Sequence, residues 1–148
     1  MAQTDSVSVT VVTYNSGRFI KRCLESVLAQ KYPNLEIIVV DNASTDGTQA
    51  VLEQFEDTCR VVYNSVNLGF AAAQNQAIQL SRGDWVLTLN PDVLLTANFI
   101  QALVDAGNLD PKVGSVCGKL LTMNANFSLP DQPLVDSTGI YFTPMLRH

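Results

Sequence analysis

The chain has 148 residues, of which 47% are apolar and 16% charged, a composition that is ordinary for a globular protein and excludes a disordered one. This length fits one domain with a substantial core. The formal net charge of -5 and the lack of any run of Lys or Arg argue against a domain held on DNA or RNA by phosphate contacts, so no nucleic-acid partner is expected.

The N-terminus and the cysteines bear on the compartment. The first residues, Met1 to Ser6, are polar, and the longest apolar runs are strand-sized, below the ~20 residues of a membrane helix. We therefore expect no signal peptide and a cytoplasmic domain, peripheral at the inner face of the membrane if the full-length protein is membrane-associated. Cys23, Cys59 and Cys117 lack the CxxC spacing of a metal site and are expected to be reduced packing residues.

Short apolar, β-branched runs alternate with segments of helical spacing. The expected strands are Val7–Thr13, Leu35–Asp41, Arg60–Tyr63, Trp85–Leu89 and one near Val113–Cys117. The expected helices have apolar residues within Phe19–Leu28, Val51–Phe55, Phe70–Ile78 and Phe99–Val104. The expected end signals are an N-cap at Asn15 or Ser16, at Ser44 or Thr45 and at Thr96, and a C-terminal glycine at Gly83 and Gly107.

Strands of nearly unbroken apolar character are buried on both faces, as in a parallel sheet covered by helices. The alternation therefore predicts an α/β fold over residues 1–118: a doubly wound, mostly parallel sheet with helices on both faces. Residues 119–148 are less regular, with one candidate strand, Ser137–Phe142. Because no capping element follows, we expect an incomplete second region in a truncated chain, with an exposed apolar edge near residues 113–142 that favours self-association.

Ligands of open parallel sheets bind beyond the carboxyl ends of the strands. The segments that follow the first four strands are all polar: Thr13–Ser16, Asp41–Gly47, Asn67–Phe70 and Asn90–Asp92. Turn chemistry alone explains any one of them, but together they indicate a binding site.

Each candidate residue has a functional and an ordinary interpretation. Asp41 can accept hydrogen bonds from a base or ribose, or can cap a helix. Asp92, placed by Pro91, can hold Mg²⁺ or Mn²⁺ when a diphosphate supplies the other oxygens, or can be a solvated turn residue. Gly69 permits close backbone approach to a ligand or starts a helix, and Tyr14 stacks on a base or belongs to the core.

Other ligand classes lack their motifs. The exit of the first strand, Thr13–Arg18, holds one glycine, so the G-x-G-x-x-G fingerprint of a dinucleotide-dependent oxidoreductase is absent, as is a Walker A loop. His148 is the sole histidine, which disfavours a Ser-His-Asp triad or a histidine metal site.

Four ordered segments resemble glycosyltransferase family 2, which has the GT-A fold, and within it the bacterial rhamnosyltransferase-like branch. They are Val11–Ser16, Ile38–Gly47, Asn67–Asn75 and Asp84–Asp92. The resemblance implies a donor site in which Asp41 bonds the nucleobase, Thr13 and Tyr14 line the base and ribose pocket, and Gly69 closes over the base. The matching donor-site residues are Thr13, Tyr14, Asn15, Asp41, Asn42, Gly69, Asn90 and Asp92.

The family's Asp-x-Asp motif, which binds ribose and a divalent metal, corresponds here to Asn90-Pro91-Asp92. Asn90 removes one charge near the metal, which leaves Asp92 as the metal ligand for Mg²⁺ or Mn²⁺. The family's catalytic base lies further downstream in a motif that this sequence does not match before His148. Asp131 and Asp136 are the remaining downstream acids.

The resemblance thus implies the donor-binding half of an inverting glycosyltransferase. Such an enzyme moves a sugar from a dTDP- or UDP-sugar, with dTDP-rhamnose the preferred donor, to a glycan or lipid-linked glycan acceptor. A non-catalytic nucleotide-binding module is the alternative.

Overall fold

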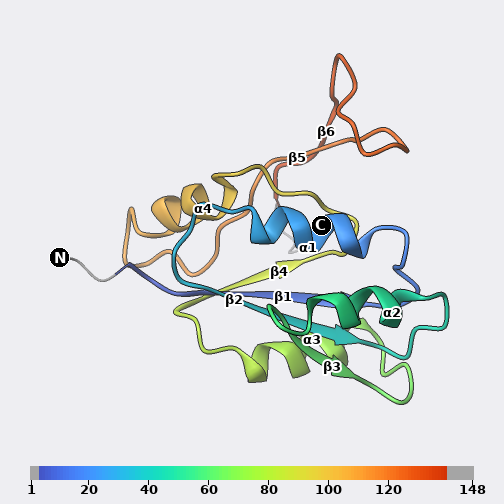
Figure 1. Cartoon of the computed structure of the whole chain (residues 1–148). Helices are drawn as coiled ribbons and strands as arrows, with labels where there is room; N and C mark the ends of the chain where they lie inside the picture. Colours follow the sequence, from blue (N-terminus) through green and yellow to red (C-terminus); the bar gives the residue numbers. More distant parts are fainter. Residues whose placement is uncertain (1–3, 140–148) are drawn as a thin grey trace, which may run out of the picture. The chain divides into compact units, whose positions relative to one another are not determined.

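The computed structural model describes residues 4–139, which form two compact units divided between Gln101 and Ala102. The first unit contains a parallel sheet of β1 (Val7–Thr13), β2 (Leu35–Asp41), β3 (Arg60–Tyr63) and β4 (Trp85–Leu89) (Figure 1). The strand order is β3-β2-β1-β4, and all neighbours are parallel. The four strands predicted up to Leu89 are therefore confirmed at both ends, as is the α/β fold class.

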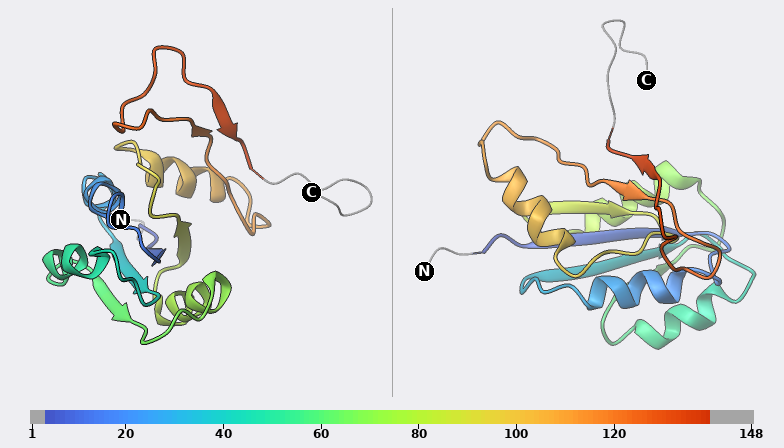
Figure 2. Two further views of the ribbon diagram at one scale, coloured as in Figure 1. Left: turned by 90° about the vertical axis from the view of Figure 1, so that its right-hand side faces the viewer. Right: turned by 90° about the horizontal axis from the view of Figure 1, so that it is seen from above.

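The helices that follow the strands are α1 (Ile20–Leu28), α2 (Thr48–Leu52) with the 3₁₀ turn η1 (Glu53–Phe55), and α3 (Phe70–Leu80). Figure 2 shows α1 and α2 on one face of the sheet and α3 on the other. The chain adds β2 and β3 on one side of β1 and then returns to place β4 on the other side. This reversal of direction is what makes the sheet doubly wound.

The core forms because β1 and β2 are apolar on both faces and helices cover each face. Every residue of β1 is buried. On the α3 face, Val12, Ile38 and Val40 pack against Ala73 and Ala77, whose small side chains bring the helix close to the sheet. On α1 the buried residues Ile20, Cys23, Leu24 and Val27 recur at helical spacing, as the sequence predicted.

The predicted N-caps of α1 and α2 are wrong. No side chain caps α1; instead a turn precedes it, in which the Ser16 carbonyl accepts the amides of Phe19 and Ile20. Before α2, Asp46 accepts hydrogen bonds from the Thr48 amide and hydroxyl. The sequence analysis predicted Ser44 or Thr45 for this capping role. A carboxylate near the first turn of a helix takes the same place as the Ser or Thr cap that the sequence suggested.

Gly83 also has a different role from the predicted helix cap. Helix α3 ends at Leu80 with Ser81 as its cap. A Cβ on Gly83 would lie 2.6 Å from the Ser8 amide nitrogen and 2.7 Å from its Oγ, and the Gly83 amide donates to that Oγ at 2.7 Å. Gly83 is therefore needed for close approach of the α3–β4 connection to β1, because any side chain would collide with the backbone.

Helix α4 (Phe99–Gly107) includes the predicted apolar positions and the predicted final glycine, and the Thr96 carbonyl accepts the Phe99 amide before it. The second unit contains a small antiparallel pair, β5 (Leu120–Leu121) and β6 (Val135–Ser137). The predicted strand at Val113–Cys117 is wrong, since these residues have no regular structure. Of the predicted strand Ser137–Phe142, Ser137 ends β6 and residues 140–142 lie outside the described residues.

No helix within residues 4–139 has the length and apolar character needed to cross a bilayer.

Candidate functional site

In an open parallel sheet the site is expected beyond the carboxyl ends of the strands, at the point where the strand order reverses. In this sheet that point lies between β1 and β4 at their carboxyl ends. A cavity of about 350 Å³ opens there. Its lining residues come from all four strand exits: Val12, Tyr14, Ser16, Asn42, Asn67, Gly69, Phe70, Asn90 and Pro91.

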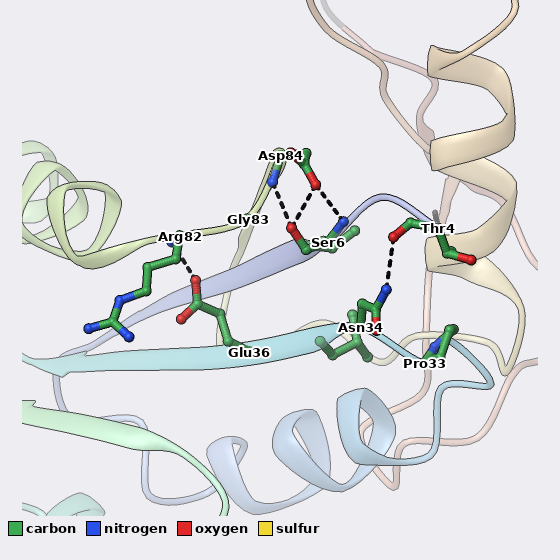
Figure 3. A pocket seen from close by; sticks show the side chains of 10 residues that line it. Thr4, Ser6, Pro33, Asn34, Glu36, Arg82, Gly83 and Asp84 are labelled. Atoms are coloured by element: carbon green, nitrogen blue, oxygen red, sulfur yellow. Dashed lines mark hydrogen bonds between the residues drawn. The ribbon is translucent and has the colours of Figure 1, made fainter. Parts of the chain in front are cut away.

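A larger cavity, of about 490 Å³, lies at the opposite edge of the sheet (Figure 3). Many of its polar groups are already paired. Asp84 accepts the Ser6 amide and hydroxyl at 2.8 and 2.7 Å, which lowers the pKa of its carboxyl, and Asn34 donates to the Thr4 carbonyl at 2.8 Å. These bonds fasten the connections at the amino ends of the strands, so we assign the candidate site to the smaller cavity.

Asp41 is fully buried, and its carboxylate accepts hydrogen bonds from residues of two exit loops. Its Oδ1 accepts the hydroxyls of Thr13 and Ser44 at 2.8 and 2.5 Å. Its Oδ2 accepts the Ser44 amide at 3.1 Å and the Gln49 amide group at 2.8 Å. Asp41 and Thr13 are not among the residues that line the cavity. A bond from Asp41 to a nucleobase stays a prediction, and what the structure shows is that Asp41 holds the exits of β1 and β2 together.

Asn42, the next residue, does line the cavity and joins the second exit to the third. Its Nδ2 donates to Asn67 Oδ1 at 2.7 Å, and its Oδ1 accepts the Leu68 amide at 2.9 Å and Asn64 Nδ2 at 3.2 Å. The side chain is thus fully engaged in shaping the loop that leads to Gly69.

Gly69 has a φ of +84°, and its amide donates to Asn67 Oδ1 at 2.9 Å. A Cβ here would meet nothing within 4 Å, so the backbone conformation and not crowding favours glycine. It immediately precedes α3.

Two aromatic side chains stand at the cavity with unusually large exposure: Tyr14 is 53% exposed and Phe70 is 59% exposed. Asn15, between Tyr14 and Ser16, does not line the cavity; its Oδ1 accepts the Thr45 amide at 2.8 Å while its own amide donates to Ser44 Oγ. Asn15 has a φ of 52°, a conformation that Asn tolerates better than most residues.

At the exit of β4, Asn90 and Pro91 line the cavity and Asp92 follows as an exposed residue. The thiol of Cys23 donates to the Asn90 carbonyl at 3.6 Å. Burial, and secondarily the charge of Asp92, raises the pKa of Cys23 to about 12, so it remains a protonated packing residue.

Asp92 is the metal ligand that the sequence predicts at this exit. Within residues 4–139 no cluster of three or more His, Cys, Asp or Glu side chains could hold a metal ion. A single carboxylate beside an amide fits Mg²⁺ or Mn²⁺ only in the mode where substrate phosphates complete the coordination.

The cavity thus brings together Tyr14, Asn42, Gly69 and Asn90 of the predicted set. It also includes Ser16, Asn67, Phe70 and Pro91, which lie inside the predicted exit segments although the sequence did not single them out as ligand contacts. Asp131 and Asp136 are exposed residues of the second unit.

Comparison with known proteins agrees with this geometry. The family model described as Glycosyl transferase family 2 matches residues 8–135. The chain belongs to glycosyltransferase family 2. The resemblance stated from the four sequence segments is therefore confirmed.

The relatives of this family 2 chain are glycosyltransferases. An N-acetylglucosaminyl-diphospho-decaprenol L-rhamnosyltransferase of Mycobacterium tuberculosis is 35% identical over 125 residues, which are 76% of this chain and 40% of the relative. The mannosyltransferase PcManGT from Pyrobaculum calidifontis, solved with GDP-Man and Mn²⁺, is 32% identical with a TM-score of 0.72, covering 80% of this chain and 37% of that one. TarS of S. aureus, solved with UDP-GlcNAc, is 29% identical with a TM-score of 0.63, covering 69% and 32%.

These structures confirm the GT-A fold of the family 2 chain. The chain spans about a third of the length of two further bacterial relatives, 34% and 35%.

Proposed function

We propose that the cavity at the carboxyl edge of the sheet binds the nucleotide of a nucleotide-diphosphate sugar, and that the protein transfers this sugar to an acceptor. The observation that carries the proposal is the convergence of four polar strand exits on one cavity, with two exposed aromatic rings beside it. Relatives solved with GDP-Man and with UDP-GlcNAc support this ligand class.

The base and ribose are assigned to the side of the cavity formed by the first three exits. The rings of Tyr14 and Phe70 offer flat apolar surfaces on which a base can stack. Asn67 and the backbone at Gly69 offer polar groups close by, and Asn42 keeps them in place. The loops that hold these groups are joined by hydrogen bonds of Thr13, Asn15 and Asp41, which do not line the cavity themselves.

The diphosphate is assigned to the fourth exit. Asn90 lines the cavity and can bond a ribose hydroxyl or phosphate oxygen, and the exposed carboxylate of Asp92 is available to a Mg²⁺ or Mn²⁺ ion shared with the diphosphate. When bound, such an ion supplies positive charge that stabilises the leaving diphosphate. The mannosyltransferase solved with Mn²⁺ supports use of a divalent metal.

For the reaction, we propose inversion at the anomeric carbon, with a dTDP- or UDP-sugar as donor and dTDP-rhamnose as the preferred one. A glycan or lipid-linked glycan is the proposed acceptor, as the name of the mycobacterial relative suggests. No Asp, Glu or His is among the described residues that line the cavity. We therefore assign the described residues to donor binding and none of them to the catalytic base.

Calorimetric titration tests this proposal directly. We expect UDP or dTDP to bind, more tightly with Mn²⁺ than without, and NAD to bind no better than buffer components. Binding of NAD in preference to UDP, dTDP and GDP would reject the nucleotide-sugar site. Sugar transfer to a glycan acceptor then separates the enzyme from a non-catalytic nucleotide-binding module.

A further inference from the structure

Three side chains on and just after helix α1 bond to a single segment of the chain. Cys23 and Ser26 lie three residues apart on the helix, and Gln30 lies two residues beyond its last residue, Leu28. All three bond to backbone atoms within residues 90–100, the segment that leads from β4 into α4.

The bonds of Ser26 and Gln30 are well formed. Ser26 Oγ accepts the Leu95 amide at 3.0 Å and donates to the Cys23 carbonyl at 2.7 Å. Gln30 Nε2 donates to the carbonyls of Thr96 and Ser26 at 2.8 and 3.1 Å, while its Oε1 accepts the Ile100 amide at 3.1 Å. The Gln30 side chain is only 9% exposed, and both ends of its amide are paired.

The segment needs these partners because residues 90–98 have no helix or strand to satisfy their backbone. Asp92 lies between the contact at Asn90 and the contact at Leu95. The Asp92 carboxylate makes no hydrogen bond to any other described residue, so its position is determined by the backbone on either side of it.

We propose that Ser26 and Gln30 are positioning residues for the donor site: by bonding the backbone at Leu95, Thr96 and Ile100 they fix the segment that follows the Asn90–Asp92 turn, and so the place where the Asp92 carboxylate meets the metal and diphosphate. This inference rests on the proposed function of Asp92. Neither side chain lines the cavity, so an effect on ligand binding must pass through the segment that they hold.

The chain offers matched pairs of variants. Ser26→Ala removes a hydroxyl that bonds the segment, whereas Ser81→Ala removes a hydroxyl that bonds only the Ala77 carbonyl at the end of α3. Gln30→Ala removes three bonds, whereas Gln54→Ala removes one bond to the Ala50 carbonyl on an exposed helix surface. Ser26→Thr retains the hydroxyl and should restore the wild-type behaviour.

The experiment measures ligand binding and amide exchange on the folded proteins. In Ser26→Ala, we expect amide exchange at Leu95 to rise about fivefold or more, and the affinity for UDP or dTDP with Mn²⁺ to fall by about fivefold. Gln30→Ala should lower the affinity for UDP or dTDP with Mn²⁺ by about tenfold. The affinity for uridine and thymidine without metal should change by less than about twofold, because the base pocket is left intact.

Two results would overturn the proposal. If Ser26→Ala and Gln30→Ala fold and keep the full gain from Mn²⁺, the two side chains are structural only. If uridine affinity falls as much as that for UDP with Mn²⁺, they support the whole site and not the Asp92 turn. Should Gln30→Ala not fold, the Ser26→Ala and Ser26→Thr pair decides alone.

The wild-type protein tests the proposed function in the same experiment. Absence of any gain from Mn²⁺ in the wild type would reject the metal role of Asp92, and with it the positioning role that depends on it. A wild-type gain that the variants retain would reject only the positioning role.

Discussion

Replacement of Asp41 tests which of two roles this residue has: it contacts the nucleotide, or it only holds the loops around the nucleotide in place. Its carboxylate accepts four hydrogen bonds, from the hydroxyls of Thr13 and Ser44 on one oxygen and from the Ser44 and Gln49 nitrogens on the other. In Asp41→Asn, the new NH₂ group can donate to the two hydroxyls, which rotate to accept. The remaining oxygen keeps both nitrogen donors.

The magnitudes follow from which groups lose a partner. Asp41→Asn keeps every pairing but loses the charge, so we expect a loss of about 1–2 kcal/mol in the free energy of unfolding. Asp41→Ala leaves the buried Ser44 amide and the buried Thr13 hydroxyl without their acceptor, whereas Gln49 is partly exposed and can turn to water. These unpaired buried groups together with lost packing amount to a loss of about 2–4 kcal/mol or more in the free energy of unfolding.

Urea unfolding and calorimetric titration with UDP and dTDP measure the two effects separately. Because the Asp41 side chain does not line the cavity, we expect Asp41→Asn to keep nucleotide affinity within about threefold. Asn42→Ala is the comparison: it should weaken binding by about tenfold, since it frees the loop before Gly69. A folded Asp41→Asn protein that loses no more stability than expected and yet loses tenfold or more in affinity would show that the carboxylate bonds the nucleotide itself.

The remaining predictions concern single side chains. Asp92→Asn should remove the gain in dTDP affinity that Mn²⁺ produces, as measured by titration with and without the metal, while leaving thymidine binding unchanged. Tyr14→Ala and Phe70→Ala should each weaken nucleotide binding by about 1–2 kcal/mol through lost stacking; equal affinities would remove the rings from the site. Gly83→Ala should lower the unfolding free energy by about 2 kcal/mol or more in urea titration, because its Cβ would collide with backbone 2.6 Å away. Cys23, with its pKa raised to about 12, should resist thiol reagents at pH 8 until the protein is unfolded; rapid labelling of the native protein would contradict its burial.

Most of the first unit could be predicted because its strands are short apolar runs with sharp polar ends. The bounds of β1 and β2 follow from this contrast, and the helix between them follows from apolar spacing. The strand expected at Val113–Cys117 fails because the same composition also suits an irregular segment when no partner strand pairs with it. The N-caps predicted for α1 and α2 were wrong because a turn, or the nearby carboxylate of Asp46, accepts the amides that a Ser or Thr cap would otherwise accept.

The site was predictable to the level of segments and less so to the level of side chains. All four strands are parallel, so their polar exits lie at the same end of the sheet whichever residues they contain. The choice between Asp41 and Asn42 depends on orientation, because successive residues of an extended chain point in opposite directions. Asp41 therefore points into the hydrogen-bonded network and Asn42 toward the cavity, a distinction that residue type alone does not reveal. The contribution of Phe70 was missed as a site feature because an aromatic residue at the start of a helix usually belongs to the core.

Hydrogen bonds connect the exits of this sheet to one another. Asn15 in the first exit bonds Thr45 in the second, and Asn42 in the second bonds Leu68 in the third. Each of these links joins a short polar side chain to a backbone amide, so each loop is held in place by a residue of another loop. A substitution in one exit therefore displaces groups in the next, and lost affinity alone does not show that a residue touches the ligand. Stability, metal-free binding and metal-dependent binding must be measured together, because only their differences separate a contact from its support.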